Sequence, residues 1–144
     1  MGKALKLELL GYDDLQHTLG DFAPKEARNI MRATVQALAV RVRDALRMNV
    51  KQDTGALRKS IRAVRRRGTE NEIVSEVRGG STAPYMLMLE FGTSKTKAQP
   101  FIGPTVEQVR PDLPRFYRED FGKKFTASVA KQAAKSAKLI KGNA

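Results

Sequence analysis

The sequence predicts an α+β fold, because helix-like and strand-like patterns occupy separate parts of the chain. Apolar residues recur at three- and four-residue steps from 25 to 50, with arginines on the opposite face, which predicts a long amphipathic helix. Alternating residues over 61–67 and 72–78 flank the turn-forming sequence Gly68–Asn71, so these segments predict an antiparallel hairpin. Helical spacing returns over 112–139 and predicts a C-terminal helix.

The chain has 144 residues, the size of one ordinary domain, so residues 1–144 are expected to fold as a single unit. Leu5, Leu7 and Leu9 alternate with charged residues and predict a short edge strand before the long helix. A short helical turn is expected at 56–60, between the long helix and the hairpin.

The apolar run 85–91 fits either a buried strand or two helical turns, because periodicity cannot decide for so short a segment. Its unbranched Met and Leu residues and the preceding Pro84 favour the helix. A polar loop is expected over 93–99, followed by an extended piece at Phe101–Ile102.

Two prolines shape the C-terminal third of the sequence. Pro104 suits the start of a brief helix, and Pro111 must interrupt it, since an internal proline removes a hydrogen bond and clashes with the preceding turn. The second half of the final helix, 123–144, is rich in lysine and alanine. We expect this part to be either a frayed tail or a helix that orders only against a partner.

Composition excludes several classes of protein. Hydrophobic residues make up 41% of the chain, enough for a core, whereas the absence of cysteine excludes disulfides and thiolate metal sites. The first ten residues are too short and too charged for a signal peptide, and about 18 apolar residues never run together, so a chain that is neither exported by a cleavable leader nor embedded in a membrane is expected.

The formal net charge of +12 predicts attraction to polyanions, above all nucleic acid. The charge is unevenly placed: residues 41–67 hold ten basic side chains against two acids, and residues 121–144 hold six lysines and no acid.

The sequence carries no recognisable catalytic or metal-binding device. His17 is the only histidine, and the chain has no cysteine or second histidine that could complete a metal site with it. A catalytic triad is equally disfavoured, because no serine lies in a nucleophile motif. Asp13–Asp14 and Glu119–Asp120 are pairs of acids adjacent in sequence. A catalytic carboxylate pair is disfavoured at both places, because side chains of adjacent helical residues do not face each other. We therefore expect no enzymatic activity, cofactor or metal.

Two other features were candidates for sites. Arg65, Arg66 and Arg67 end the first hairpin strand, where three guanidinium groups either engage phosphates or form a solvated hairpin end that discourages edge aggregation. Glu90 ends the apolar run beside Phe91; a salt bridge to an arginine of the long helix or of an adjacent subunit is favoured over a general acid, since no partner base is present.

Three short motifs in register resemble the tail-component family of long-tailed bacteriophages, which includes head-to-tail joining and tail-completion proteins. The first is Asp53–Ile61, with the pattern tGxLrkSI; the second runs from Tyr85 to Thr93 and ends in the sequence Leu-Glu-Phe-Gly-Thr; the third is Gln99–Pro104, containing Pro-Phe-Ile-Gly-Pro. Met86 and Met88 depart from the small residues usual in the second motif.

The resemblance implies a small antiparallel sheet packed against the long helix, in a subunit of a ring with six-fold symmetry at the junction between capsid connector and tail tube. Partners would be further copies of the chain, head connector or adaptor proteins, and a tail terminator or tail tube protein, with DNA in the channel as a further candidate. The location implied is the virion, after assembly in the host cytoplasm.

In this reading Leu89, Glu90, Phe91 and Phe101 fix the central fold and an adjoining surface, and Gly92 permits a backbone geometry that other residues resist. The segment from Thr93 to Gln99, with Lys95 and Lys97, would be a loop available to a partner. The rival hypothesis is a basic nucleic-acid-binding accessory protein, in which Arg65 to Arg67 and the C-terminal lysines grip phosphate.

Overall fold

The computed structural model describes residues 5–6, 24–50 and 55–142. Their elements, in chain order, are β1 (Leu5–Lys6), α2 (Pro24–Asn49), α3 (Gly55–Ser60), β2 (Ile61–Arg66), β3 (Val74–Gly79), α4 (Ala83–Phe91), α5 (Ile102–Val109), the 3₁₀ turn η1 (Arg110–Asp112) and α6 (Leu113–Gly142). The predicted α+β fold is confirmed. Leu7, Leu9, His17 and Asp13–Asp14 lie outside the described residues.

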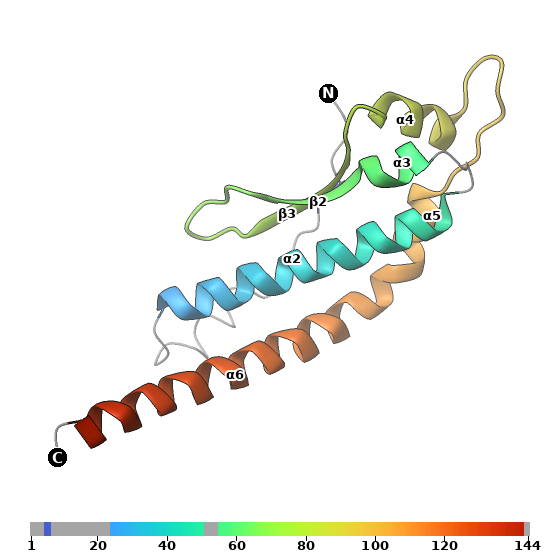
Figure 1. Cartoon of the computed structure of the whole chain (residues 1–144). Helices are drawn as coiled ribbons and strands as arrows, with labels where there is room; N and C mark the ends of the chain where they lie inside the picture. Colours follow the sequence, from blue (N-terminus) through green and yellow to red (C-terminus); the bar gives the residue numbers. More distant parts are fainter. Residues whose placement is uncertain (1–4, 7–23, 51–54, 143–144) are drawn as a thin grey trace.

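The long helix α2 lies between the β2–β3 hairpin on one side and α6 on the other (Figure 1). The short elements α3, α4 and α5 gather around the C-terminal end of α2, and α6 runs back antiparallel to it. This arrangement explains why α2 is apolar on more than one face: it has a sheet and a helix to cover.

The sheet is antiparallel with strand order β1-β3-β2, so β3 is central. In the hairpin Ile61 pairs with Gly79 and Ala63 with Val77, and β1 places Leu5 opposite Val77. Because side chains alternate along a strand, the buried Ile61, Ser75 and Val77 face α2 and their neighbours in sequence face away from it.

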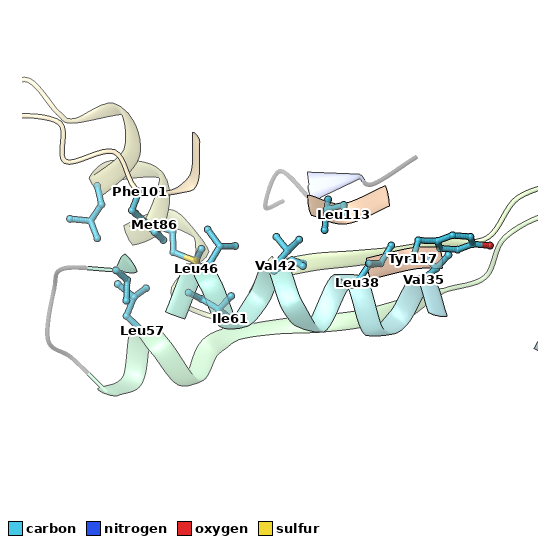
Figure 2. Packing of buried hydrophobic residues seen from close by; sticks show 14 residues of the cluster. Val35, Leu38, Val42, Leu46, Leu57, Ile61, Met86, Phe101, Leu113 and Tyr117 are labelled. Atoms are coloured by element: carbon cyan, nitrogen blue, oxygen red, sulfur yellow. The ribbon is translucent and has the colours of Figure 1, made fainter. Parts of the chain in front are cut away.

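Buried apolar side chains from every layer form one core (Figure 2). Leu38, Val42 and Leu46 of α2 are at its centre, with Ile61 from β2 on one side and Leu113 from α6 on the other. The remaining members of the core come from the middle of α2 and the residue after it, from α3, β3, α4 and α6, and from the loop before α5: Val35, Ala39, Val50, Leu57, Val77, Met86, Leu89, Phe101 and Tyr117.

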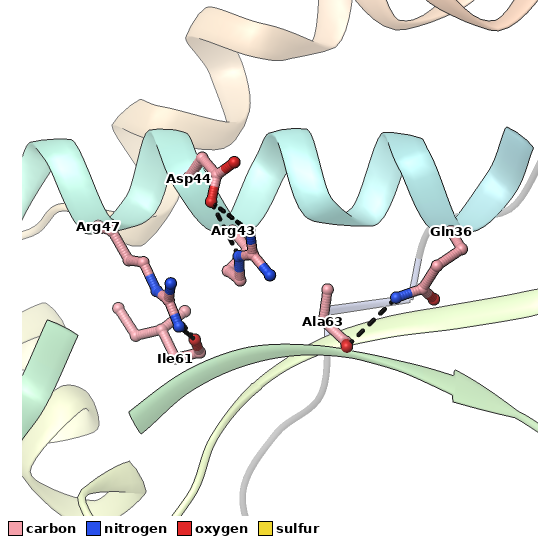
Figure 3. A network of polar contacts seen from close by, with 6 residues as sticks. All are labelled: Gln36, Arg43, Asp44, Arg47, Ile61 and Ala63. Atoms are coloured by element: carbon pink, nitrogen blue, oxygen red, sulfur yellow. Dashed lines mark hydrogen bonds and ion pairs between the residues drawn. The ribbon is translucent and has the colours of Figure 1, made fainter. Parts of the chain in front are cut away.

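Polar side chains of α2 satisfy backbone carbonyls of the edge strand β2 (Figure 3). Arg47 donates from Nε and Nη2 to the carbonyl of Ile61 at 3.1 and 2.6 Å, and Gln36 donates to the carbonyl of Ala63 at 3.3 Å. An edge strand otherwise presents unpaired carbonyls that invite pairing with another chain. The polar contacts therefore attach the hairpin to α2 and protect its edge.

The hairpin connection is longer than the four-residue turn that the sequence predicts, since the strands end at Arg66 and begin again at Val74. Arg28 at the start of α2 donates its guanidinium N–H groups to the carbonyls of Thr69 and Glu70 in this connection. A side chain from the helix thus satisfies carbonyls that a tight turn would satisfy within itself.

The helical prediction for 85–91 is confirmed by α4, and Pro111 interrupts the next helix as predicted, in the turn η1. One prediction here is wrong: Ile102 is the first residue of α5 and not part of an extended piece. The lysine-rich segment is helical as far as Gly142, so the frayed-tail alternative does not describe residues 123–142.

Candidate functional site

Helix α4 has one buried face and one exposed face. Met86 and Leu89 are buried in the core, whereas Tyr85, Met88 and Phe91, spaced three residues apart, are exposed. Leu89, Glu90, Phe91 and Phe101 were expected to fix the central fold and an adjoining surface. Phe91 is 71% exposed and belongs to the surface, whereas Leu89 belongs to the core. We call Tyr85, Met88 and Phe91 the α4 surface.

Glu90 lies between these faces and caps the next helix. Its Oε2 accepts hydrogen bonds from the backbone N–H groups of Phe101 and Ile102 at 2.7 and 2.8 Å, and its Oε1 accepts one from Gly103 at 2.9 Å. A carboxylate at this position complements the unsatisfied N–H groups and positive dipole end of α5. Among the described residues Glu90 binds these backbone donors and not an arginine of the long helix. An ion pair with an arginine of an adjacent subunit, the other predicted partner, stays a prediction.

Gly92 turns the chain out of α4 with φ of +74°. A Cβ atom here would lie 2.8 Å from the backbone nitrogen of Ala98, so a larger residue would be both strained and obstructed. The backbone geometry agrees with the role expected of this glycine. It starts a loop that returns to α4, where the N–H of Gln99 donates to the carbonyl of Leu89 at 2.7 Å.

The loop is ordered by its own hydrogen bonds. The Thr93 hydroxyl accepts from the N–H groups of Lys95 and Thr96 at 3.3 and 3.0 Å, and the N–H of Thr93 donates to the carbonyl of Thr96 at 2.9 Å. All residues from Thr93 to Pro100 are exposed, while Phe101 is buried and anchors the end of the loop in the core. Lys95 and Lys97 therefore sit on a closed, outward loop beside the α4 surface (Figure 1).

The structure does not bring Arg65, Arg66 and Arg67 together as one site. Strand alternation places Arg65 on the side of the sheet that faces α2 and Arg66 on the opposite side, and Arg67 follows the end of the strand. Arg66 is paired with Glu76 at 3.3 Å. Three guanidinium groups in sequence are thus distributed around the hairpin, so a phosphate cannot meet all three on one face.

A second exposed apolar region lies on the second half of α6. Val129, Leu139 and Ile140 are exposed, and we call them the α6 surface. Leu113 and Tyr117 near the start of α6 pack beside Val42 and Leu38 of α2 (Figure 2). At 1.5 Å per residue, the antiparallel course then carries the last turns of α6 roughly 15–20 Å past the start of α2.

Among residues 5–6, 24–50 and 55–142 no group of three or more acidic or histidine side chains is placed to hold a metal ion. No helix in the same described part is long and apolar enough to cross a membrane. Asp120, one of the adjacent acids of α6, pairs with Lys124.

The molecule is therefore an α+β module, made of one long central helix, a small antiparallel sheet and a long C-terminal helix, with apolar side chains exposed at both of its ends. Residues 13–92 match the family described as "Bacteriophage HK97-gp10, putative tail-component". The chain belongs to this family, the HK97-gp10-like bacteriophage tail components. No curated protein and no solved structure gave a match.

The family match spans α2, the hairpin and α4 and ends at Gly92. It includes the motifs at 53–61 and most of the motif that ends at Thr93, but not Gln99–Pro104. The carboxylate of Glu90, inside the matched range, binds the backbone of Phe101 and Ile102 in the motif outside it.

Proposed function

We propose that the protein is a structural component of the virion that completes the tail or joins it to the head connector, as one subunit of a closed ring. It acts through contacts with other proteins and without catalytic turnover. Its partners are further copies of itself on either side, a connector or adaptor protein of the head, and a terminator or tube protein of the tail. Its place is the head–tail junction.

The observation that carries this proposal is the separation of the two exposed apolar surfaces. The α4 surface lies beside the C-terminal end of α2, and the last turns of α6, which carry Leu139 and Ile140 of the α6 surface, lie beyond the other end (Figure 1). Since α2 has 26 residues, the two surfaces are roughly 40 Å or more apart. Two different surfaces at opposite ends of a subunit are what a head-to-tail contact requires, and such contacts form a ring where the rotation between neighbouring subunits closes.

The loop from Thr93 to Pro100 follows α4 and is closed by hydrogen bonds within it and to α4. A preordered loop loses little conformational entropy on binding, so more of the contact free energy remains as affinity. Family membership supports a tail component, and the ring, its six-fold symmetry and the junction are our proposal.

Electron microscopy of phage particles assembled with and without this protein tests the assignment. We expect particles that lack it to show heads and tails that fail to join, or tails without their head-proximal collar, and labelled protein to appear at that position in complete particles. Complete, joined virions that lack the polypeptide would contradict the proposal.

The rival function, a nucleic-acid-binding accessory protein, predicts a different outcome in solution. Such a protein should bind duplex DNA tightly as an isolated subunit, with a steep dependence on salt. A joining protein should instead form closed oligomers, with weaker DNA binding. Sedimentation of the purified chain with and without DNA separates the two.

A further inference from the structure

The register of the hairpin opposes two arginines on the sheet face that points away from α2. Arg62 of β2 is the direct cross-strand partner of Arg78 of β3, and both are exposed. Residues directly opposite on antiparallel strands have Cβ atoms about 4.5–5.5 Å apart, and like charges in that relation destabilise the pair. We call these two residues the arginine pair.

Within the described part of the chain, no ion pair engages the arginine pair. Glu76 is the one acid on this face of β2 and β3; it lies two residues before Arg78, and its carboxylate pairs with Arg66. Arg58 and Lys59, both exposed on α3, precede β2 and add positive charge near the arginine pair. Cations therefore outnumber the one carboxylate on this face, and a bound anion would reduce the repulsion between Arg62 and Arg78.

From this geometry we propose that the arginine pair is a binding site for the phosphodiester backbone of duplex DNA. The planar guanidinium forks form bidentate hydrogen bonds to phosphate oxygens, and two of them at cross-strand distance can engage one phosphate or its neighbour. The net charge of +12 supplies the long-range attraction. The site does not depend on the proposed ring, because all of its residues belong to one subunit.

The composition of this face favours a polyanion over an acidic protein. Protein interfaces have buried aromatic or aliphatic anchors at their centres. The large exposed apolar side chains of the described residues lie in α2, α4 and α6, while Val64 and Val74 on this sheet face are half-buried. A face with cations but without exposed apolar anchors fits the wet, charged surface of DNA.

Fluorescence anisotropy of the full chain with labelled duplex DNA tests the proposal. For the double variant R62Q/R78Q we expect roughly tenfold weaker binding, and a plot of log affinity against log salt less steep by about 1.8, since two phosphate contacts are lost. The matched control is R32Q/R118Q, which removes the same charge from exposed positions of α2 and α6. Its slope should change by less than about 1.

Two further measurements control for the loss of charge and for the stability of the fold. R62K/R78K keeps the charge but loses the bidentate fork, so it should retain the salt slope and bind several-fold more weakly than wild type. Thermal unfolding of R62Q/R78Q should be no lower than that of wild type, because the opposed charges are removed. A lower unfolding temperature would contradict the repulsion on which the proposal rests.

Several outcomes would overturn the assignment. If R62Q/R78Q and R32Q/R118Q weaken DNA binding equally, the attraction is diffuse and the arginine pair is not a site. If neither variant changes DNA binding, the arginine pair does not bind DNA. Polyglutamate that binds as tightly as DNA and with the same dependence on the arginine pair would assign the surface to an acidic protein. Displacement of DNA by inorganic phosphate, at ionic strength where chloride has no effect, would assign it to free phosphate.

Discussion

At the scale of single residues, Glu90 connects the two halves of the structure. It belongs to α4 within the family match, yet its hydrogen bonds go to the N–H groups that begin α5. The carboxylate closes the base of the exposed loop and fixes where α5 starts. This single contact determines the position of the loop beside the α4 surface.

Replacement of Glu90 by alanine should lower the free energy of unfolding by about 1–3 kcal/mol, because three backbone donors lose their acceptor. Urea denaturation measures the loss, and cleavage by trypsin at Lys95 or Lys97 should become faster. E107A is the control, since the Glu107–Arg110 pair is exposed and 3.9 Å long. Equal stability of E90A and E107A would show that the cap has no energetic role.

Two members of the α4 motif, Leu89 and Phe91, should respond differently to truncation. L89A should lose about 2–5 kcal/mol of unfolding free energy, because Leu89 is 8% exposed and its removal leaves a cavity. F91A should change stability by less than about 0.5 kcal/mol, since the ring is already in water. Denaturant titration of both variants decides this, and a loss for F91A as large as that for L89A would place the ring in the core.

Sequence reasoning identified the α4 motif but did not separate its core-facing side from its exposed side. Every position from Met86 to Leu89 is apolar, so the pattern does not indicate which side chains face the core. The role of Glu90 was also missed, because its partners are backbone N–H groups about eleven residues away and carry no signal in the side chains. The one sequence signal for this capping role is an acid followed by a loop and the start of a new helix.

At the scale of elements, α2 is covered from two sides, and its interior polar groups differ in how well they are satisfied. Thr34 is fully buried and its hydroxyl has no hydrogen-bond partner within the described structure. Ser75 of β3 is also buried, but its hydroxyl donates to Oε1 of Gln36 at 2.9 Å. A buried hydroxyl therefore lowers stability at Thr34 and raises it at Ser75.

Replacement of Thr34 by valine, which has the same shape, should raise the unfolding free energy by about 0.5–1.5 kcal/mol, because an unpaired hydroxyl leaves the core. S75A should lower it by about 1–3 kcal/mol, since the Gln36 oxygen loses its donor in a partly buried site. Equilibrium unfolding of both variants measures the difference. Destabilisation by T34V would mean that its hydroxyl is satisfied in solution.

The helices were the elements most accessible from sequence. The long apolar stripe placed α2, Pro84 helped to place α4, and Pro111 placed the break before α6. The cross-strand opposition of Arg62 and Arg78 could not be predicted, because it depends on register, which a connection of uncertain length leaves undetermined. The hairpin connection proved longer than its turn-like sequence indicated, and Arg28 compensates for that length.

The C-terminal part of α6 is helical for reasons that lie mostly within its own sequence. Tyr117, Phe121 and Phe125 stack along one side with ring centroids 5.8 and 6.0 Å apart, and the Phe116 ring lies under the guanidinium of Arg41. Beyond them alanine and lysine, both strong helix formers, dominate. The exposed α6 surface thus lies on a helix whose first turns pack against α2.

At the scale of the whole molecule, charge and apolar surface act in opposite directions. A subunit with a net charge of +12 repels its copies, while the α4 and α6 surfaces favour association. Salt screens the repulsion without weakening apolar burial. Assembly and DNA binding should therefore depend on salt with opposite signs.

Self-association should strengthen between about 50 and 200 mM salt, whereas binding to duplex DNA should weaken over the same range. Sedimentation velocity follows the first and fluorescence anisotropy the second, on the same preparation. Self-association that weakens with salt would show that ion pairs, and not the two apolar surfaces, hold the subunits together.

The central claim is that one copy presents its α4 surface to the α6 surface of the next, and mixing two assembly-defective variants tests it most directly. M88D/F91D disables the first surface and V129D/I140D the second, and all four side chains are exposed, so both variants should fold. Native mass spectrometry should find each variant monomeric alone and an equimolar mixture stopping at the heterodimer, because only one intact contact can form. A mixture that remains monomeric, or either variant that still forms rings alone, would contradict the head-to-tail contact.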